Sequence, residues 1–328
     1  MQRLGLTIGL EGAGLRDLVE LCGRAEEAGY TDLWTAEVGG ADGLTPLGAL
    51  AVTTRTARLG TGIVPVFTRP PALLAMSAAA LQDLSGGRFV LGLGTSSDVI
   101  VERWMGGSFK RPLTRLREYV EVIRASLAGG TVEFEGLTTS VDGYRIQHDP
   151  GAPVPIHLAA LGPTACALAG EVADGVIFFL KTPDGVRQAL EWTSPARADF
   201  DCVMRIPLLV DEEPEVVDVA ARRLLLSYAP VGVYARSLAG QGFGAEIAAI
   251  REAWAAGDRK RATQLVTDRM IDGLLISGGV ERCRGRIEEL RAAGVTTPVL
   301  LPMSFVDDPA ERARRVTGAV EALAPARS

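Results

Sequence analysis

Only a small set of side chains in this sequence could bind a metal or move a proton. The histidines are His148 and His157, so a multi-histidine metal centre is excluded. The four cysteines lie far apart with no Cys-x-x-Cys pair, which favours reduced, buried thiols over a zinc site or a disulfide framework. The carboxylates that follow predicted strands are Glu11, Glu37, Asp42 and Asp98. No metal site is therefore predicted.

The types and spacing of the polar residues also argue against several covalent mechanisms. There is no Ser-His-Asp arrangement, and no two carboxylates share one predicted strand end as glycoside hydrolysis would require. No lysine lies within a predicted core strand, and Lys181 stands just past one, which disfavours a Schiff base. Glycines and small hydroxyl residues are common at the strand ends, where backbone N–H groups can approach a ligand. This pattern predicts a site that binds an organic cofactor mainly through the backbone.

Short apolar runs that alternate with amphipathic segments must position these residues. The predicted strands are 4–9, 31–36, 58–64, 88–94, 154–160, 175–180, 202–210 and 298–302. The predicted helices include 15–28, 45–54, 71–84 and 113–128, and the polar stretch 131–147 predicts a small hairpin. A long helical region from about 214 to 293 precedes the last strand, and a terminal helix follows Asp307.

This order of elements predicts an α/β fold. We expect a (β/α)8 TIM barrel with an insertion after strand 4 and a long helical region before strand 8. We expect residues 1–328 to form a single domain. A doubly wound open sheet is the alternative, but no Gly-x-Gly-x-x-Gly motif follows the first strand. In a barrel the functional residues lie at the carboxyl ends of the strands.

Composition and charge argue against other classes of protein. Of 328 residues, 47% are hydrophobic and 23% are charged, so the chain can bury a large core. The 34 basic and 40 acidic side chains give a formal net charge of −6, which disfavours a nucleic-acid partner and a polybasic membrane anchor. No apolar run approaches the roughly 20 residues of a membrane span, and Glu11 ends the apolar start before a secretory core could form. We expect a cytoplasmic protein whose partner is a small-molecule substrate.

Several motifs resemble those of the bacterial-luciferase-like superfamily, in order and at matching spacing over nearly the whole chain. They are residues 31–37, 58–65, 69–75, 84–94, 154–163 and 169–175. The block Leu84-Ser85-Gly86-Gly87-Arg88 is particularly specific. Within the superfamily the chain is most similar to the branch that uses the deazaflavin coenzyme F420, notably the methylenetetrahydromethanopterin reductases. Relatives that use FMN share much of the same pattern.

The resemblance implies roles for individual residues. Family members carry a non-prolyl cis peptide in a bulge at the end of strand three that supports the cofactor ring, and Gly62–Ile63 occupies that position. Glu37 stands where the family has the acid that contacts the deazaflavin, and it is the expected catalytic residue. The cofactor phosphate is expected against loop amides near 95–96 and 160–162. The expected cofactor-binding residues are Ala36, Gly62, Ile63, Val64, Thr95, Ser96, Ala160, Leu161, Gly162 and Lys181.

Each candidate also has a purely structural interpretation. Glu37 could cap the next segment or pair with an arginine, and the residues 95–96 could cap a helix that begins near Asp98. Lys181 could be a solvated loop charge, and His157 is expected to be a core histidine.

The sequence departs from the family pattern at two positions. Val38 follows the acid where a histidine is common, and Thr7 lies in strand one where the reductase has an acidic residue. The proton donor therefore stays open.

These implications predict an oxidoreductase that transfers hydride between F420 and a small organic substrate. The reaction would reduce a C=C or C=N bond or oxidise an alcohol. An FMN-dependent luciferase-like monooxygenase is the first alternative, and a non-catalytic flavin-binding barrel is an alternative of another class. The resemblance also implies a homodimer, for which the apolar helices over 71–84 and 113–127 could supply the interface.

Overall fold

Parallel strands close into a ring at the centre of the molecule. The computed structural model describes residues 2–8, 14–210 and 213–325. β10 pairs with β9 on one side and with β12 on the other, and β12 pairs with β1, so the ring has no free edge. The predicted TIM barrel is confirmed, and the open doubly wound sheet is excluded. The ring strands are β1 (Gly5–Thr7), β2 (Asp32–Thr35), β3 (Arg58–Thr61) with β4 (Val64–Pro65), β5 (Phe89–Gly94), β8 (Ile156–Ala159), β9 (Gly175–Phe179), β10 (Asp201–Leu209) and β12 (Thr297–Met303).

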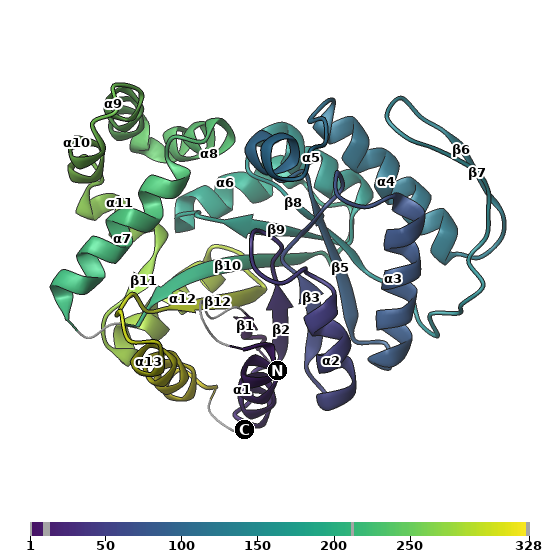
Figure 1. Ribbon diagram of the computed structural model, residues 1–328, viewed down its shortest axis with the longest axis horizontal. Helices are drawn as coiled ribbons and strands as arrows, with labels where there is room; N and C mark the ends of the chain where they lie inside the picture. The colour runs from purple at the N-terminus through teal and green to yellow at the C-terminus, as the bar shows by residue number, and fades with distance from the viewer. Residues whose placement is uncertain (1, 9–13, 211–212, 326–328) are drawn as a thin grey trace.

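Helices cover the outside of the ring (Figure 1). Their inward faces and the outward faces of the strands form the main apolar core, in which Leu33, Leu59 and Leu91 are each 0% exposed. Proline lies in the first turn of most of these helices, where its missing N–H removes no helical hydrogen bond. The covering helices are α1 (Leu15–Glu27), α2 (Thr45–Thr53), α3 (Pro71–Leu84), α4 (Pro112–Leu127), α5 (Pro163–Val172), α6 (Pro183–Thr193), α12 (Val280–Ala292) and α13 (Pro309–Ala322).

An insertion follows β5, as the sequence predicts for strand 4. The added elements lie on either side of α4: the π-helical segment η1 (Val99–Trp104) precedes this helix, and an antiparallel hairpin of β6 (Val132–Glu135) and β7 (Ser140–Tyr144) follows it. The predicted hairpin is therefore confirmed. Because η1 begins shortly after β5 ends, it continues directly from the carboxyl end of the barrel.

A helical lobe follows β10 and lies at the left of Figure 1. It has an apolar cluster of its own, which includes Leu225, Leu238 and Ile250. The predicted helical region over 214–293 is confirmed except that β11 (Ile276–Ser277) interrupts it and pairs with β10. The helices of the lobe are α7 (Pro214–Tyr228), α8 (Gly232–Leu238), η2 (Ala239–Phe243), α9 (Gly244–Ala255), α10 (Arg259–Gln264) and α11 (Asp268–Leu274).

Charged residues at the start of three strands close the amino-terminal end of the barrel. Asp32, Arg58 and Asp201 begin β2, β3 and β10. Arg58 donates to Asp32, and its guanidinium lies 2.6 Å from the Asp201 carboxylate. An interior layer of apolar side chains, which includes Trp34 and Val203, lies next to this cluster. Since this end is filled, a ligand can enter the barrel only from the carboxyl end.

The third strand of the barrel contains a bulge. Gly60 pairs with Val90, and Val64 pairs with Leu93. The chain therefore advances four residues from 60 to 64, while the paired strand β5 advances three from 90 to 93. One extra residue is accommodated at Gly62–Ile63, and the expected bulge is confirmed. The expected cis peptide is wrong, because the described residues contain no cis peptide bond. The extra residue is sufficient to interrupt the pairing while the peptide keeps the trans form that non-prolyl bonds favour.

Candidate functional site

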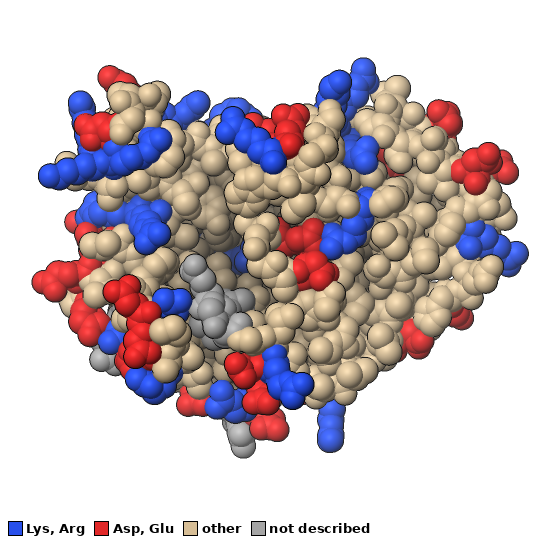
Figure 2. Space-filling model, viewed as in Figure 1, with Lys and Arg blue, Asp and Glu red and all other residues tan. Residues whose placement is uncertain are grey.

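The predicted site residues lie at the carboxyl ends of the barrel strands. Residues 36–37 follow β2, 95–96 follow β5, and 160–162 follow β8, while Lys181 stands two residues after β9. Because the strands are parallel, their ends form one rim, so segments distant in the sequence are brought together there. The space-filling view shows a recess between the helical lobe and the rest of this face (Figure 2).

Backbone hydrogen bonds fix the bulge against the end of β2. Gly62 N donates to Thr35 O at 2.6 Å, and Glu37 N donates to Ile63 O at 3.3 Å. A Cβ atom on Gly62 would lie 2.6 Å from Arg205 Cδ and 2.9 Å from Thr35 O. Only glycine fits this close approach, so the bulge is a fixed platform whose shape depends on residue type.

The two side chains after Gly62 pack in different parts of the molecule. Ile63 packs against the interior layer of the barrel and keeps partial access to solvent. Val64 is 0% exposed and belongs to the core between the strands and the outer helices. Ile63 can therefore contact a ligand through its side chain, whereas Val64 can do so only through its backbone.

Glu37 connects two loops of the rim. Its carboxylate accepts hydrogen bonds from Gly43 N at 2.9 Å and from the Arg69 guanidinium at 2.7 Å. Thr68 Oγ1 lies 3.4 Å from the same carboxylate, whose side chain is 10% exposed. The arginine pairing that the sequence left as an alternative is present. These contacts hold the carboxylate in one orientation between the loop after β2 and the loop after β4.

The residues after β5 have an unusual backbone. Ser96 has a φ of +60°, in the left-handed region that non-glycine residues rarely adopt. Thr95 Oγ1 donates to Ser96 O at 3.3 Å, and both residues keep partial access to solvent. The capping interpretation is wrong for both, because neither side chain accepts a hydrogen bond from the backbone of η1; Ile100 N donates to Ser97 Oγ at 3.4 Å instead. Strained backbone of this kind is common at ligand sites.

The amino-terminal end of α5 also lies at the rim. Gly162 immediately precedes α5, and a Cβ atom there would meet nothing within 4 Å. Ala160 is buried and its N–H donates to Ile177 O at 3.2 Å, so among 160–162 the accessible backbone is at Leu161 and Gly162. The free N–H groups and the dipole of a helix start favour a bound anion, such as a phosphate.

Lys181 is buried, so its interpretation as a solvated loop charge is wrong. It is 2% exposed, and Nζ donates to Leu161 O at 3.0 Å and to Ser237 Oγ at 3.2 Å. Burial lowers the pKa of its ammonium group. The side chain therefore connects the loop after β8 to α8 and places a positive charge beside 160–162.

Gln241 is a rim residue that the sequence analysis missed. Its side-chain amide accepts from Thr182 N at 2.8 Å and donates to Leu180 O at 3.1 Å. Leu180 has a φ of +52°. Gln241 thus holds the strained turn after β9. No local sequence pattern predicts this contact, because Gln241 lies 59 residues after Thr182 in the chain.

Arg205 is the second residue that the sequence analysis missed. It lies in the middle of β10, and its side chain crosses the barrel interior to reach Gly62 and Thr7. Burial lowers the pKa of its guanidinium. The available signal was an arginine inside an otherwise apolar strand over 202–209, because such a residue is rarely buried without a purpose.

His157 lies at the closed base and not at the rim. It is 2% exposed and stacks on Trp34, with a ring-centroid distance of 6.1 Å. Burial lowers its pKa to about 4, so the imidazole is neutral near neutral pH. Its interpretation as a core histidine is confirmed.

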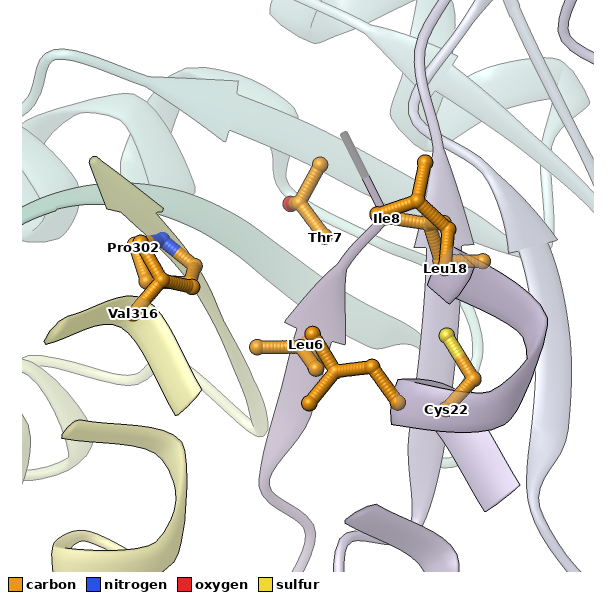
Figure 3. A pocket seen from close by; sticks show the side chains of 8 residues that line it. Leu6, Thr7, Ile8, Leu18, Cys22, Pro302 and Val316 are labelled. Atoms are coloured by element: carbon orange, nitrogen blue, oxygen red, sulfur yellow. The ribbon is translucent and has the colours of Figure 1, made fainter. Parts of the chain in front are cut away.

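A small apolar pocket lies outside the barrel mouth, between β1, α1, β12 and α13 (Figure 3). Leu6, Leu18 and Cys22 face Pro302 and Val316 across it. Burial raises the pKa of the Cys22 thiol to about 12, so the thiol is unreactive. This pocket offers no group for catalysis.

Among the described residues, no group of three or more His, Cys, Asp or Glu side chains could hold a metal ion. None of the helices in this part of the chain is long and apolar enough to cross a membrane. Glu11, one of the carboxylates near a strand end, lies outside the described residues.

The barrel and its rim are those of a known family. The family model for luciferase-like monooxygenases matches residues 2–297, and the chain belongs to this family. The chain is 33% identical over 287 residues to the 5,10-methylenetetrahydromethanopterin reductase of Archaeoglobus fulgidus. The match covers 84% of this chain and 86% of that enzyme. It is also 30% identical over 237 residues to the F420-dependent glucose-6-phosphate dehydrogenase of Amycolatopsis mediterranei. That match covers 66% of this chain and 71% of the dehydrogenase.

A solved structure has the same fold. The coenzyme F420-dependent tetrahydromethanopterin reductase of Methanopyrus kandleri superposes with a TM-score of 0.75 at 23% identity, and the match covers 98% of this chain and 97% of that one. This likeness shows the fold, and the family model over residues 2–297 confirms the expected membership of the luciferase-like superfamily.

Proposed function

We propose that this chain is an oxidoreductase that transfers hydride between coenzyme F420 and a small organic substrate. The observation that carries the proposal is the barrel rim, where a fixed backbone bulge and an open helix start lie among few titratable groups. Relatives named as an F420-dependent dehydrogenase and as a methylenetetrahydromethanopterin reductase support it. The reaction is the reduction of an electron-poor C=C or C=N bond, or the oxidation of an alcohol.

The residues at the rim fit a flat cofactor with a phosphate. When bound, F420 supplies or accepts two electrons as a hydride. Ile63 and the bulge backbone would support the ring, beside the small side chain of Ala36. The backbone of 160–162 at the start of α5 would bind the phosphate with Lys181 nearby.

The loop after β5 would complete the phosphate site. Thr95 and Ser96 offer hydroxyl and amide groups on a partly exposed turn. The strained φ of Ser96 is consistent with a backbone shaped for a ligand rather than for local stability.

For Glu37 we propose a role in proton transfer at the rim. Its backbone adjoins the bulge, since its own N–H donates to Ile63 O. Its pairing with Arg69 also makes it an anchor of the two loops. The two roles differ in outcome, because an anchor contributes mainly to binding and stability whereas a proton-transfer group contributes to turnover.

A pair of titrations tests the function. The purified protein is titrated with F420 and, separately, with FMN, and binding is followed by the change in cofactor fluorescence. We expect F420 to bind, and the reduced form to be oxidised by at least one member of a panel of activated enones, imines and ketones. Oxygen-dependent turnover with FMN would instead support a monooxygenase. Binding without turnover would support a non-catalytic flavin-binding barrel, and no binding of either would overturn the proposal.

We also propose a homodimer formed through α3. Large apolar side chains are exposed on this helix, namely Leu73 at 45%, Met76 at 49% and Leu84 at 53%. α4, the other helix expected at the interface, shows no such cluster among its described residues. Light scattering after size exclusion tests the proposal, and Met76→Glu should shift the mass to that of a monomer.

Two further proposals concern the chain as a whole. We propose a cytoplasmic location, because Cys22, Cys166, Cys202 and Cys283 are all free and buried. We also propose that residues 1–328 unfold as one domain. Cell fractionation tests the first proposal, and a single cooperative transition in urea is expected for the second.

A further inference from the structure

Arg205 places a positive charge inside the barrel. Its side chain begins on β10 and reaches the bulge, where a Cβ atom on Gly62 would touch its Cδ. Its hydrogen-bond contact with the described residues is Nε to Thr7 Oγ1, at 3.5 Å, which is at the limit for a hydrogen bond. Among the described residues no carboxylate lies within ion-pair distance of its guanidinium.

Two other arginines beside the barrel strands, Arg58 and Arg88, have their partners within the protein. Arg58 pairs with both Asp32 and Asp201. Arg88 donates to four backbone carbonyl oxygens, those of Ser85, Ala57, Ala51 and Thr54. An unpaired buried charge is costly, so proteins normally provide such partners. The contrast indicates that the partner of Arg205 is supplied by a ligand.

A chain of aromatic side chains begins beside Arg205. The guanidinium carbon lies 5.7 Å from the centre of the Phe179 ring. The rings of Phe179 and Tyr228 are 5.2 Å apart, and those of Tyr228 and Tyr234 are 4.8 Å apart. Burial raises the pKa of both tyrosines, that of Tyr234 to about 12, so both keep the O–H that can donate a hydrogen bond.

These rings come from both the barrel and the helical lobe. Phe179 ends β9, Tyr228 ends α7, and Tyr234 lies in α8. All three keep partial access to solvent, as does Arg205, so the group is not a sealed core. It lies on the side of the barrel formed by β9 and β10, whereas the expected phosphate residues follow β5 and β8.

We propose that Arg205 binds the carboxylate of the substrate, and that the substrate is an organic acid whose flat apolar body lies against Phe179, Tyr228 and Tyr234. The parallel N–H donors of a guanidinium can bind a carboxylate or a phosphate, but its single positive charge balances a carboxylate and not a phosphate dianion. The inference rests on the proposed function. Because the Arg205 side chain lies against Gly62, an acid bound to Arg205 lies next to the expected position of the reacting ring.

A binding experiment with matched pairs of probes tests this inference. Benzoate and cinnamate are compared with benzamide and cinnamamide, which have nearly the same shape but no charge, by calorimetric titration of the full chain with and without F420. We expect each acid to bind at least tenfold more tightly than its amide. R205M should remove this preference, R205K should keep part of it, and Y228F should weaken it only severalfold. R223M, an exposed position on α7, is the matched control.

Stability and cofactor binding separate the possible failures. Because Met removes an unpaired charge and keeps the apolar stem, the Tm of R205M should equal or exceed that of the wild type. A large fall in Tm would show that Arg205 has a structural partner and would overturn the inference. A second result would also overturn the inference: the wild type shows no preference for acids, and R205M no longer binds F420. The charge of Arg205 would then serve the cofactor and not the substrate. If the wild type binds the acids but no F420, the proposed function fails and the carboxylate site stands.

Discussion

Acid should destabilise this fold mainly through His157. The side chain is 2% exposed and stacks on Trp34, and its Nδ1 has no hydrogen-bond partner in the described structure. Burial disfavours the imidazolium, Arg58 disfavours it further, and Asp201 favours it. The net result is a pKa of about 4 in the folded protein against a usual value of 6.5.

The sign and the size of the effect follow from linkage. Since the folded pKa is the lower one, the unfolded chain binds the proton first as the pH falls. The contribution of neutral His157 is complete above about pH 6.5 and is lost as the pH falls toward 4. A difference of about 2.5 in pKa corresponds to about 3 kcal/mol of unfolding free energy. Below this range Asp201 adds to the loss: burial opposes its ionisation, but Arg58 and His157 lower its pKa to about 2.

Urea unfolding at a series of pH values measures this effect. The free energy of unfolding of the wild type should fall by about 3 kcal/mol more than that of His157→Gln between pH 6.5 and 4. His148→Gln is the matched control, because His148 is the other histidine of the chain and its side chain is 51% exposed. If His157→Gln and the wild type lose stability in parallel, the imidazole is not buried in the neutral form and the reasoning is refuted.

Three substitutions at the rim have distinct expected outcomes. Glu37→Gln should leave the fold and most F420 binding intact and lower turnover by about 10²–10⁴; unchanged turnover with weaker binding would make Glu37 an anchor only. Gly62→Ala should cost about 1–3 kcal/mol of unfolding free energy, because its Cβ would lie 2.6 Å from Arg205 Cδ. Gly48→Ala, at a helical position where a Cβ meets nothing within 4 Å, should be neutral or stabilising in the same urea assay. Lys181→Met should weaken F420 binding at least tenfold in a fluorescence titration if the ammonium group binds the cofactor phosphate. An unchanged affinity would mean that Lys181 only connects the loop after β8 to α8.

Much of the fold was predictable because its signals are local. Strands buried on both faces read as apolar runs, and the predicted 71–84 coincides with α3. The predicted strand ends then indicated which residues lie at the rim, because parallel strands in a barrel have their carboxyl ends at the same mouth. The short β11 was not predictable, because two residues carry no periodicity and the strand exists only through its pairing with β10.

The contacts of the site were not predictable for a different reason. Glu37 and Arg69 meet only because the loops after β2 and β4 are adjacent in the closed ring. The reach of Arg205 to Gly62 likewise depends on ring closure, which places β10 across the interior from the bulge. The positive φ of Ser96 has no sequence signal, since serine does not favour that region.

The barrel separates its charges along its axis, and β10 contributes to both ends. Asp201, Val203 and Arg205 alternate along this strand, so they share its inward face. Asp201 is neutralised at the closed base by Arg58, whereas Arg205 stays unpaired among the described residues toward the open end. Since TIM barrels place stability at the amino-terminal end and ligand binding at the carboxyl end, the base charge should matter for folding and the mouth charge for recognition. The same strand therefore carries an acid whose loss should lower stability and an arginine whose loss should not.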